Sequence, residues 1–270
     1  MSTATRHVID SIPKPFLRNR RVVFFEAVGT LLTAWALLSW GVGLTETVSS
    51  PILVAESVIT LLQSGEWVPH FSASIRRILY GFAFAVFLGT GLGILMGVSG
   101  FWESVFQDYI TIGLAFPSVF IVFFAAMWFG IGDGAAVATA AIAPFPFVAQ
   151  NVYQGVENTD HRLTEMANSF DVSRHRTLWR VVFRSVLPEW FSGVRYGFAG
   201  SWKLVTLAEA IAAERGVGFM IQENMNQLSI TGVLTWTILF AVVIMIIEYG
   251  VLQQIEKRVF DWREDTAVAW

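Results

Sequence analysis

Residues 156–188, VENTDHRLTEMANSFDVSRHRTLWRVVFRSVLP, form the longest polar stretch between apolar runs of this chain. The stretch holds five of the 18 basic residues, which are Arg162, Arg174, Arg176, Arg180 and Arg184. Lysine and arginine collect in loops on the cytoplasmic side of a membrane. The loop is therefore expected on that side of any membrane that the flanking segments cross.

Two short helices are predicted within this loop. Asp160 can cap a first helix over about 161–170, and Ser173 can cap a second helix that runs to about Val186. Asp171 lies between them, where the chain must bend. The second helix has a basic face and an apolar face, formed by Arg176, Arg180 and Arg184 and by Leu178, Val182 and Val186. Such a helix can lie flat under a bilayer or dock into a groove of a cytoplasmic partner.

The composition is that of a membrane protein. Of 270 residues 54% are hydrophobic and 14% charged, with a mean hydropathy of +0.57, whereas soluble domains carry about 25% charged residues. There is no cysteine, and the four histidines lie outside the apolar runs, so neither a disulfide nor a metal site is predicted. The phosphate-binding pattern Gly-x-x-x-x-Gly-Lys-Ser/Thr is absent from the sequence, so ATP is not expected to bind this chain in the usual way.

Six apolar segments are predicted to cross the membrane, each long enough for about 30 Å of hydrocarbon. They lie at about 22–40, 74–98, 104–129, 135–153, 190–212 and 231–253. Most basic residues fall on one side of this arrangement, which places both termini in the cytoplasm. The predicted organisation is a tail at 1–21, a transmembrane domain at 22–256 that includes the loop 156–188, and a tail at 257–270.

Several local patterns within these segments predict packing or bending. The second segment carries a stripe of small residues at four-residue spacing, which are Gly81, Ala85, Gly89, Gly93 and Gly97, and such stripes let helices approach closely. Pro51 is expected to start an amphipathic helix at the outer surface. Pro117 lies inside the third segment. Pro144 and Pro146 interrupt the fourth, which makes it a candidate wall of a translocation pathway.

The fifth segment contains two charges, Lys203 and Glu209. A charge at the bilayer centre costs about 2.5–3.5 kcal/mol, so both should face the protein interior, a partner or water. Lys203 beside Trp202 can meet an anionic substrate, or it can make a structural contact. For Glu209 a structural hydrogen bond to a neighbouring helix is the favoured alternative to ligand contact. The candidate pathway residues are Trp202, Lys203, Glu209, Phe145, Pro117 and Pro144.

The loop resembles the EAA loop of permeases from binding-protein-dependent ABC importers. That pattern is Glu-Ala-Ala, three residues, Gly, nine residues, Ile, one residue, Leu-Pro. The corresponding residues here are Glu165, Met166, Ala167, Asp171, Val181, Phe183 and Arg184. Asp171 replaces the glycine, and aspartate tolerates a positive φ better than most residues. Arg184 replaces the proline, which restores a backbone donor and leaves the second helix unbroken to Leu187-Pro188.

The resemblance extends over roughly residues 48–258, to a permease subfamily that serves nitrate, taurine, alkanesulfonate and related anions or small heterocycles. Its short motifs occur here in order. They are Ser49-Ser50-Pro51; Ser74, Arg77, Gly81 and Phe82; Trp128-Phe129-Gly130 and Gly132; Gly193 and Arg195; Trp202 and Glu209; and Gly216 and Gly218.

This resemblance implies an all-α, type I importer permease, multi-pass in a bacterial inner membrane and with no catalytic residue or cofactor of its own. The implied partners are a second permease copy, two cytoplasmic ATP-binding subunits that hold ATP and Mg, and a periplasmic or lipid-anchored solute-binding protein; nucleic acid is not among them. The residues expected to contact the ATPase are Glu165, Met166, Ala167, Asp171, Arg176, Arg180 and Arg184.

The expected substrate is a small anion of the sulfonate, nitrate, taurine or carboxylate type, moved by alternating access. A neutral, pyrimidine-like heterocycle is the alternative substrate. An ion-coupled secondary transporter is a further alternative, although the six segments show no evident inverted repeat. An intramembrane enzyme is disfavoured, because no His, Cys or paired carboxylates converge within the segments.

Overall fold

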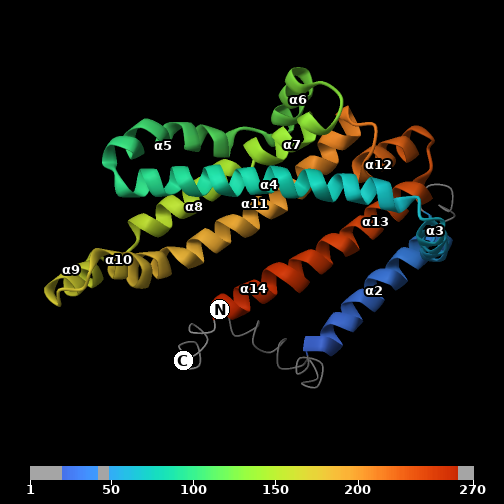
Figure 1. The fold of residues 1–270 in the computed structure, drawn as a ribbon. Coiled ribbons are helices and arrows are strands. Elements are labelled where there is room, and N and C mark those ends of the chain that lie inside the picture. Colours follow the sequence, from blue (N-terminus) through green and yellow to red (C-terminus); the bar gives the residue numbers. More distant parts are fainter. Residues whose placement is uncertain (1–19, 42–48, 261–270) are drawn as a thin grey trace, which may run out of the picture.

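A computed structural model describes residues 20–41 and 49–260, and every regular element in these ranges is helical (Figure 1). The predicted tails lie almost entirely outside these ranges. The helices are α2 (Arg20–Gly41), α3 (Pro51–Ser64), α4 (Trp67–Val98), α5 (Gly100–Ala115), α6 (Ser118–Phe129), α7 (Asp133–Ile142), α8 (Phe145–Glu157), α9 (His161–Ser169), α10 (Arg174–Thr177), α11 (Phe183–Ala212), α12 (Val217–Asn226), α13 (Ile230–Ile247) and α14 (Gln253–Val259). Two π-helical segments, η1 (Leu178–Val182) and η2 (Glu248–Leu252), join α10 to α11 and α13 to α14.

Four helical stretches are long and apolar enough to cross a membrane. They are Val22–Trp40, Trp67–Val98, Asp133–Glu157 and Ile230–Val259, and the bent pair α5 and α6 makes a fifth if it counts as one span. Helix α11 has 30 residues, about 45 Å, which is long enough to cross, but it is not apolar enough to belong to this group. The predicted count of six spans is therefore not confirmed.

The third predicted span, 104–129, is not one helix. It breaks at Pro117, and α5 and α6 meet there at 99°. A proline disfavours the helical conformation at the residue before it, and Phe116 is accordingly extended, with φ −71° and ψ 127°. The position of Pro117 within this segment was known from the sequence, but the large bend angle was not predicted.

Two other helices begin earlier than predicted. Helix α4 starts at Trp67 instead of Ser74, and α11 starts at Phe183 instead of Trp190. The chain from Arg174 runs as one helical stretch through η1, Arg184 and Pro188 into α11. The loop is thus directly continuous with the fifth predicted span.

Helix α3 is built as the sequence predicts. The N–H of Leu53 donates to Ser50 Oγ at 3.3 Å, Pro51 occupies the first turn, and Gly65 ends the helix with φ +74°. Helix α2 packs little against the other residues that the structure describes. Only 6% of the apolar stretch Val22–Trp40 is buried, and Trp35 Nε1 donates to the carbonyl of Ser49 at 2.9 Å.

The small-residue stripe of α4 packs against α7 and α8, as predicted, and these helices lie side by side (Figure 1). A Cβ added at Gly89 would lie 2.7 Å from the Cβ of Val148, and one at Gly93 would lie 2.5 Å from the carbonyl oxygen of Ala149. Real Cβ atoms do not approach so closely. The absence of side chains at Gly89 and Gly93 therefore allows α4 and α8 to lie this close together.

This contact yields a prediction with an internal control. Gly93→Ala should lower the free energy of unfolding by about 1–3 kcal/mol, because the methyl group would push α4 away from α8. Gly91, two residues away, has nothing within 4 Å of an added Cβ. Gly91→Ala should leave stability unchanged or raise it by up to about 1 kcal/mol. Thermal unfolding in detergent, followed by circular dichroism, measures both, and equal losses would contradict the packing role.

Candidate functional site

The predicted loop has the local structure that its sequence indicates. The N–H of Arg162 donates to Asp160 Oδ1 at 2.9 Å, which confirms the cap of α9. Asp171 has φ +53°, so the bend is made in the left-handed region that glycine would favour. The second helix begins after Ser173, whose carbonyl accepts from the N–H of Thr177 at 3.0 Å.

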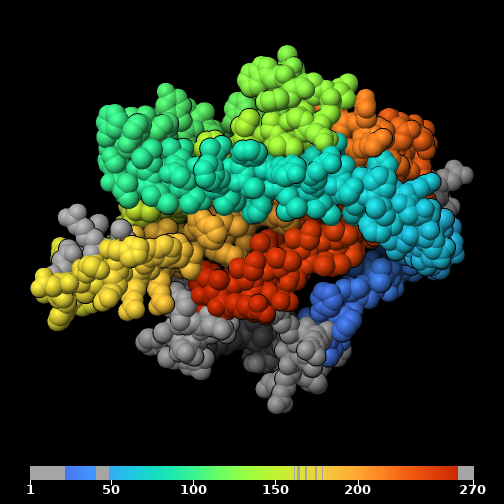
Figure 2. Space-filling view, in the orientation of Figure 1, coloured from blue at the N-terminus to red at the C-terminus, as the bar shows by residue number. Residues whose placement is uncertain are grey.

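The loop forms one end of the molecule, as the yellow segments of Figure 2 show. Of the residues expected to contact an ATPase, Ala167 is buried and the other six are exposed: Glu165, Met166, Asp171, Arg176, Arg180 and Arg184. Phe170, Trp179 and Phe183 are also largely exposed there, at 76%, 57% and 48%. Sequence reasoning emphasised the arginines and missed these aromatic side chains. Their mixture with basic groups suits a protein partner better than lipid phosphates alone.

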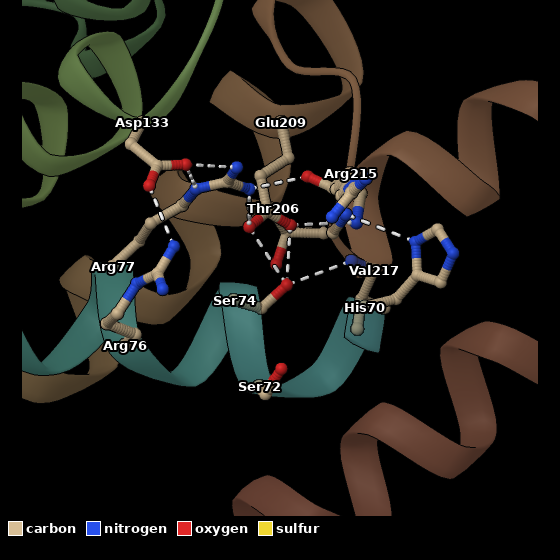
Figure 3. Close-up of polar contacts among 12 residues, drawn as sticks. His70, Ser72, Ser74, Arg76, Arg77, Asp133, Thr206, Glu209, Arg215 and Val217 are labelled. Atoms are coloured by element: carbon tan, nitrogen blue, oxygen red, sulfur yellow. Dashed lines mark hydrogen bonds and ion pairs between the residues drawn. The ribbon is translucent and has the colours of Figure 1, made fainter. Parts of the chain in front are cut away.

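Near the opposite end of the long helices, an ion-pair cluster joins four segments (Figure 3). Arg77 of α4 donates from Nη1 to Glu209 Oε1 of α11 at 2.7 Å, and from Nε to Asp133 Oδ1 of α7 at 2.8 Å. Its Nη1 also donates to the carbonyl of Arg215, just before α12. The side chain of Arg77 is 4% exposed and that of Glu209 is fully buried. We refer to these contacts as the outer cluster.

Glu209 is satisfied from several directions within the outer cluster. Ser74 Oγ lies 2.7 Å from its Oε2, and the N–H of Gly218 donates to the same oxygen at 3.0 Å. Ser74 Oγ in turn accepts from the N–H of Val217 at 2.9 Å. A Cβ at Gly216, where φ is +132°, would overlap the Glu209 carboxylate. Residues of three of the short sequence motifs, Ser74 with Arg77, Glu209, and Gly216 with Gly218, therefore meet at one carboxylate and its arginine.

These ion pairs were not predicted from the sequence. Helix α4 begins ten residues before Arg77, so Arg77 lies within the helix and is buried against carboxylates. Asp133, the first residue of α7, pairs with both Arg76 and Arg77. Glu209 makes hydrogen bonds to a neighbouring helix, which is the structural role that the sequence favoured for it. Its role as a pathway residue stays a prediction.

The candidate pathway residues do not all lie together. Pro144 and Lys203 line one cavity of about 290 Å³, with Ser118, Ala143, Phe147, Tyr196, Ala199, Gly200 and Leu204. Trp202 does not line this cavity; it packs edge-on against Phe240, and Lys203 Nζ lies over its ring, 5.6 Å from the centre. Phe145 lines other, apolar cavities beside α4 and α5. Pro117 precedes Ser118 at the bend.

Comparisons with known proteins fit this arrangement. Residues 71–261 match the family described as "Binding-protein-dependent transport system inner membrane component". This chain belongs to that family. The taurine transport system permease protein TauC of Escherichia coli K12 is 30% identical, covering 87% of this chain and 89% of its own length. The putative aliphatic sulfonates transport permease protein SsuC of Bacillus subtilis 168 is 26% identical, over 87% of each chain.

A solved structure shows the same fold. One chain of the MetNI methionine ABC transporter, in an inward-facing conformation, superposes with a TM-score of 0.61 at 17% identity, covering 76% of this permease and 98% of that chain. The permease therefore has the type I ABC importer fold. It is a multi-pass inner membrane component that works with separate ATP-binding subunits and a solute-binding protein, and it is a transport subunit and not an enzyme.

The outer cluster yields a prediction in which adjacent arginines serve as variant and control. Arg77→Gln should lower the free energy of unfolding by about 3 kcal/mol or more, because Glu209 would remain buried without its cation. Arg76 also pairs with Asp133, at 2.8 Å, but its side chain is 55% exposed. Arg76→Gln should cost less than about 1 kcal/mol. Chemical denaturation of both purified variants measures these losses. Similar losses in the free energy of unfolding would show that burial does not determine how much each ion pair contributes.

Proposed function

We propose that this permease forms the translocation pathway of an ATP-driven importer for a small sulfonate-type anion, and that the pathway runs along one face of α11. This face carries Ser192, Arg195, Tyr196, Ala199 and Lys203, whose spacing places them on one side of a helix. Tyr196 is 65% exposed, the Arg195 side chain is 39% exposed, and Lys203 is exposed.

The exposed cation of Lys203 on α11 is the observation that carries this proposal. Among the described residues, Lys203 has no carboxylate partner within ion-pair distance. A cation turned to hydrocarbon is costly, so the face should meet water or another protein chain. Helix interruptions at Pro144 and at the bend before Ser118 border the same cavity, and irregular backbone within a membrane is tolerated beside such spaces.

A second copy of the permease supplies the other wall in this proposal. In a two-fold symmetric pair, the α11 faces of both copies would turn towards a shared axis. The pathway would then be lined by two sets of cations with low-dielectric walls. Cations in such a lining attract an anion more strongly than the same cations would in bulk water.

The substrate class follows from the lining and from the relatives. TauC and SsuC are described as permeases for taurine and for aliphatic sulfonates. In this chain the cation of Lys203 lies beside the aromatic side chains of Phe147 and Tyr196 in one cavity. A cation next to aromatic walls suits a sulfonate head on a small organic body.

Uptake into proteoliposomes tests the function directly. The permease, reconstituted with its ATP-binding subunits, should accumulate taurine only when ATP and the solute-binding protein are present. Lys203→Met should reduce uptake by about tenfold, because the neutral side chain no longer attracts the anion. Lys203→Arg, which keeps the charge, is the control and should retain most activity. Uptake by the permease alone, driven by an ion gradient, would contradict the importer assignment.

An unchanged rate of taurine uptake by Lys203→Met would leave the importer assignment standing, but it would refute the proposal that Lys203 attracts an anion. Preferred uptake of a neutral pyrimidine over taurine would have the same consequence. These outcomes are separable because ATP dependence and substrate charge are measured in different arms of one assay.

We further propose that the loop 156–188 binds the ATP-binding subunits, which hold ATP and Mg. Arg180→Glu should reduce ATP-dependent uptake by at least about tenfold, because it reverses a charge at the exposed docking surface. Membrane insertion should be unaffected. Lys257→Glu reverses another exposed cation, on α14, and serves as the control. Normal uptake with Arg180→Glu would indicate that the loop only rests on lipid.

A further inference from the structure

Arg195 is the second cation on the α11 face, about 12 Å along the helix from Lys203. Unlike Lys203, it is held by carboxylates from the last helical stretch. Its Nη2 donates to Glu248 Oε1 at 2.7 Å, and its Nη1 donates to Glu256 Oε2 at 2.8 Å. Nε adds a third bond, to Glu248 Oε1 at 3.1 Å. One guanidinium therefore faces two carboxylates.

This ion pair opens into a cavity. The space, about 420 Å³, is lined by Ser192, Arg195, Tyr196, Ala199 and Glu248. Tyr196 and Ala199 also line the cavity of Lys203, so the two spaces adjoin along α11. An anion that leaves Lys203 along this face would meet Arg195 next.

The burial of this pair differs from that of the outer cluster. The side chains of Arg195, Glu248 and Glu256 are 39%, 25% and 37% exposed, whereas Arg77 is 4% exposed and Glu209 is fully buried. Exposed ion pairs contribute little to stability. The contacts of Arg195 are therefore weak enough to be exchanged, whereas those of Arg77 are not.

The backbone is also irregular at this position. Glu248 is the first residue of the π-helical segment η2, which interrupts the helix between α13 and α14. Single π-helical turns inside α-helices occur frequently at functional sites. Here the π-helical segment begins at Glu248, the residue that accepts hydrogen bonds from two nitrogens of Arg195.

We propose that Arg195 is a second anion-binding residue of the pathway and that Glu248 and Glu256 are its resident counter-ions, displaced by each passing sulfonate. The inference rests on the proposed function, in which this face of α11 lines the pathway. An unpaired arginine would hold the anion too tightly for onward movement. Conduction needs binding that is favourable enough to admit the solute and weak enough to release it. Carboxylates that compete for the guanidinium supply this balance.

A purely structural clamp between α11 and α13 would show the same hydrogen bonds. The two roles differ in the electrostatic potential that a solute meets in the cavity. The chain has no cysteine, so a single introduced cysteine reports this potential without background. The reporter is Tyr196→Cys, on the lining of both cavities, in the complete importer. Its reaction rates with an anionic and a cationic methanethiosulfonate reagent are measured, and their ratio is the readout.

The expected shifts have opposite signs. With Glu248→Gln, the anionic-to-cationic rate ratio should rise by about tenfold, because Arg195 loses a neutralising charge. With Arg195→Gln, the ratio should fall by about tenfold, while Arg195→Lys should restore it. A cysteine at Leu228, which is 87% exposed and precedes α13, is the control and should show no change.

Two results would overturn the inference, in distinguishable ways. If the reporter reacts with both reagents but neither Glu248→Gln nor Arg195→Gln alters the ratio, the pair is a structural clamp. The proposed pathway would stand in that case. If the reporter reacts with neither reagent while the Leu228 cysteine reacts with both, the α11 face does not meet water. The proposed function would then fail together with this inference.

Discussion

The outer half of the permease depends on one buried cation. Arg77 can lie 4% exposed only because carboxylates and a carbonyl satisfy its donors, and these come from α7, α11 and the segment before α12. Burying a charge without such partners is prohibitive. The requirement therefore fixes the relative positions of segments that lie far apart in the sequence. Arg195 also pairs with carboxylates, but these ion pairs are partly exposed, so a solute anion can displace the carboxylates.

Helix α11 connects the functional regions. It continues from the loop through η1, carries Arg195 and Lys203 along its middle, and ends beside the outer cluster with Glu209. The glycines of α4 and α11 hold α8 closely between these helices. One continuous helical stretch thus connects the loop to the cavities and to the outer cluster. Coupling between distant sites is carried by elements of this kind when they have two discrete arrangements.

Local features were predictable because they depend on neighbouring residues. The cap at Asp160, the bend at Asp171 and the start of α3 at Pro51 follow from backbone chemistry. The packing of the α4 stripe follows from its period. The 99° bend at Pro117, the pairing of Arg77 with Asp133 and the packing of Trp202 against Phe240 were not predictable, because each depends on which distant segment packs alongside. The sequence gives only the order of the short motifs, and the fold shows that residues of three of them meet at Glu209.

The central claim is that the charged faces of two α11 helices line one pathway. Cross-linking of identical single cysteines in the assembled importer tests it most directly, since the natural chain has none. A short bifunctional thiol reagent should join two copies through Tyr196→Cys and should fail to join them through Phe87→Cys, on the exposed side of α4. Efficient dimer formation through Phe87→Cys and none through Tyr196→Cys would contradict the account.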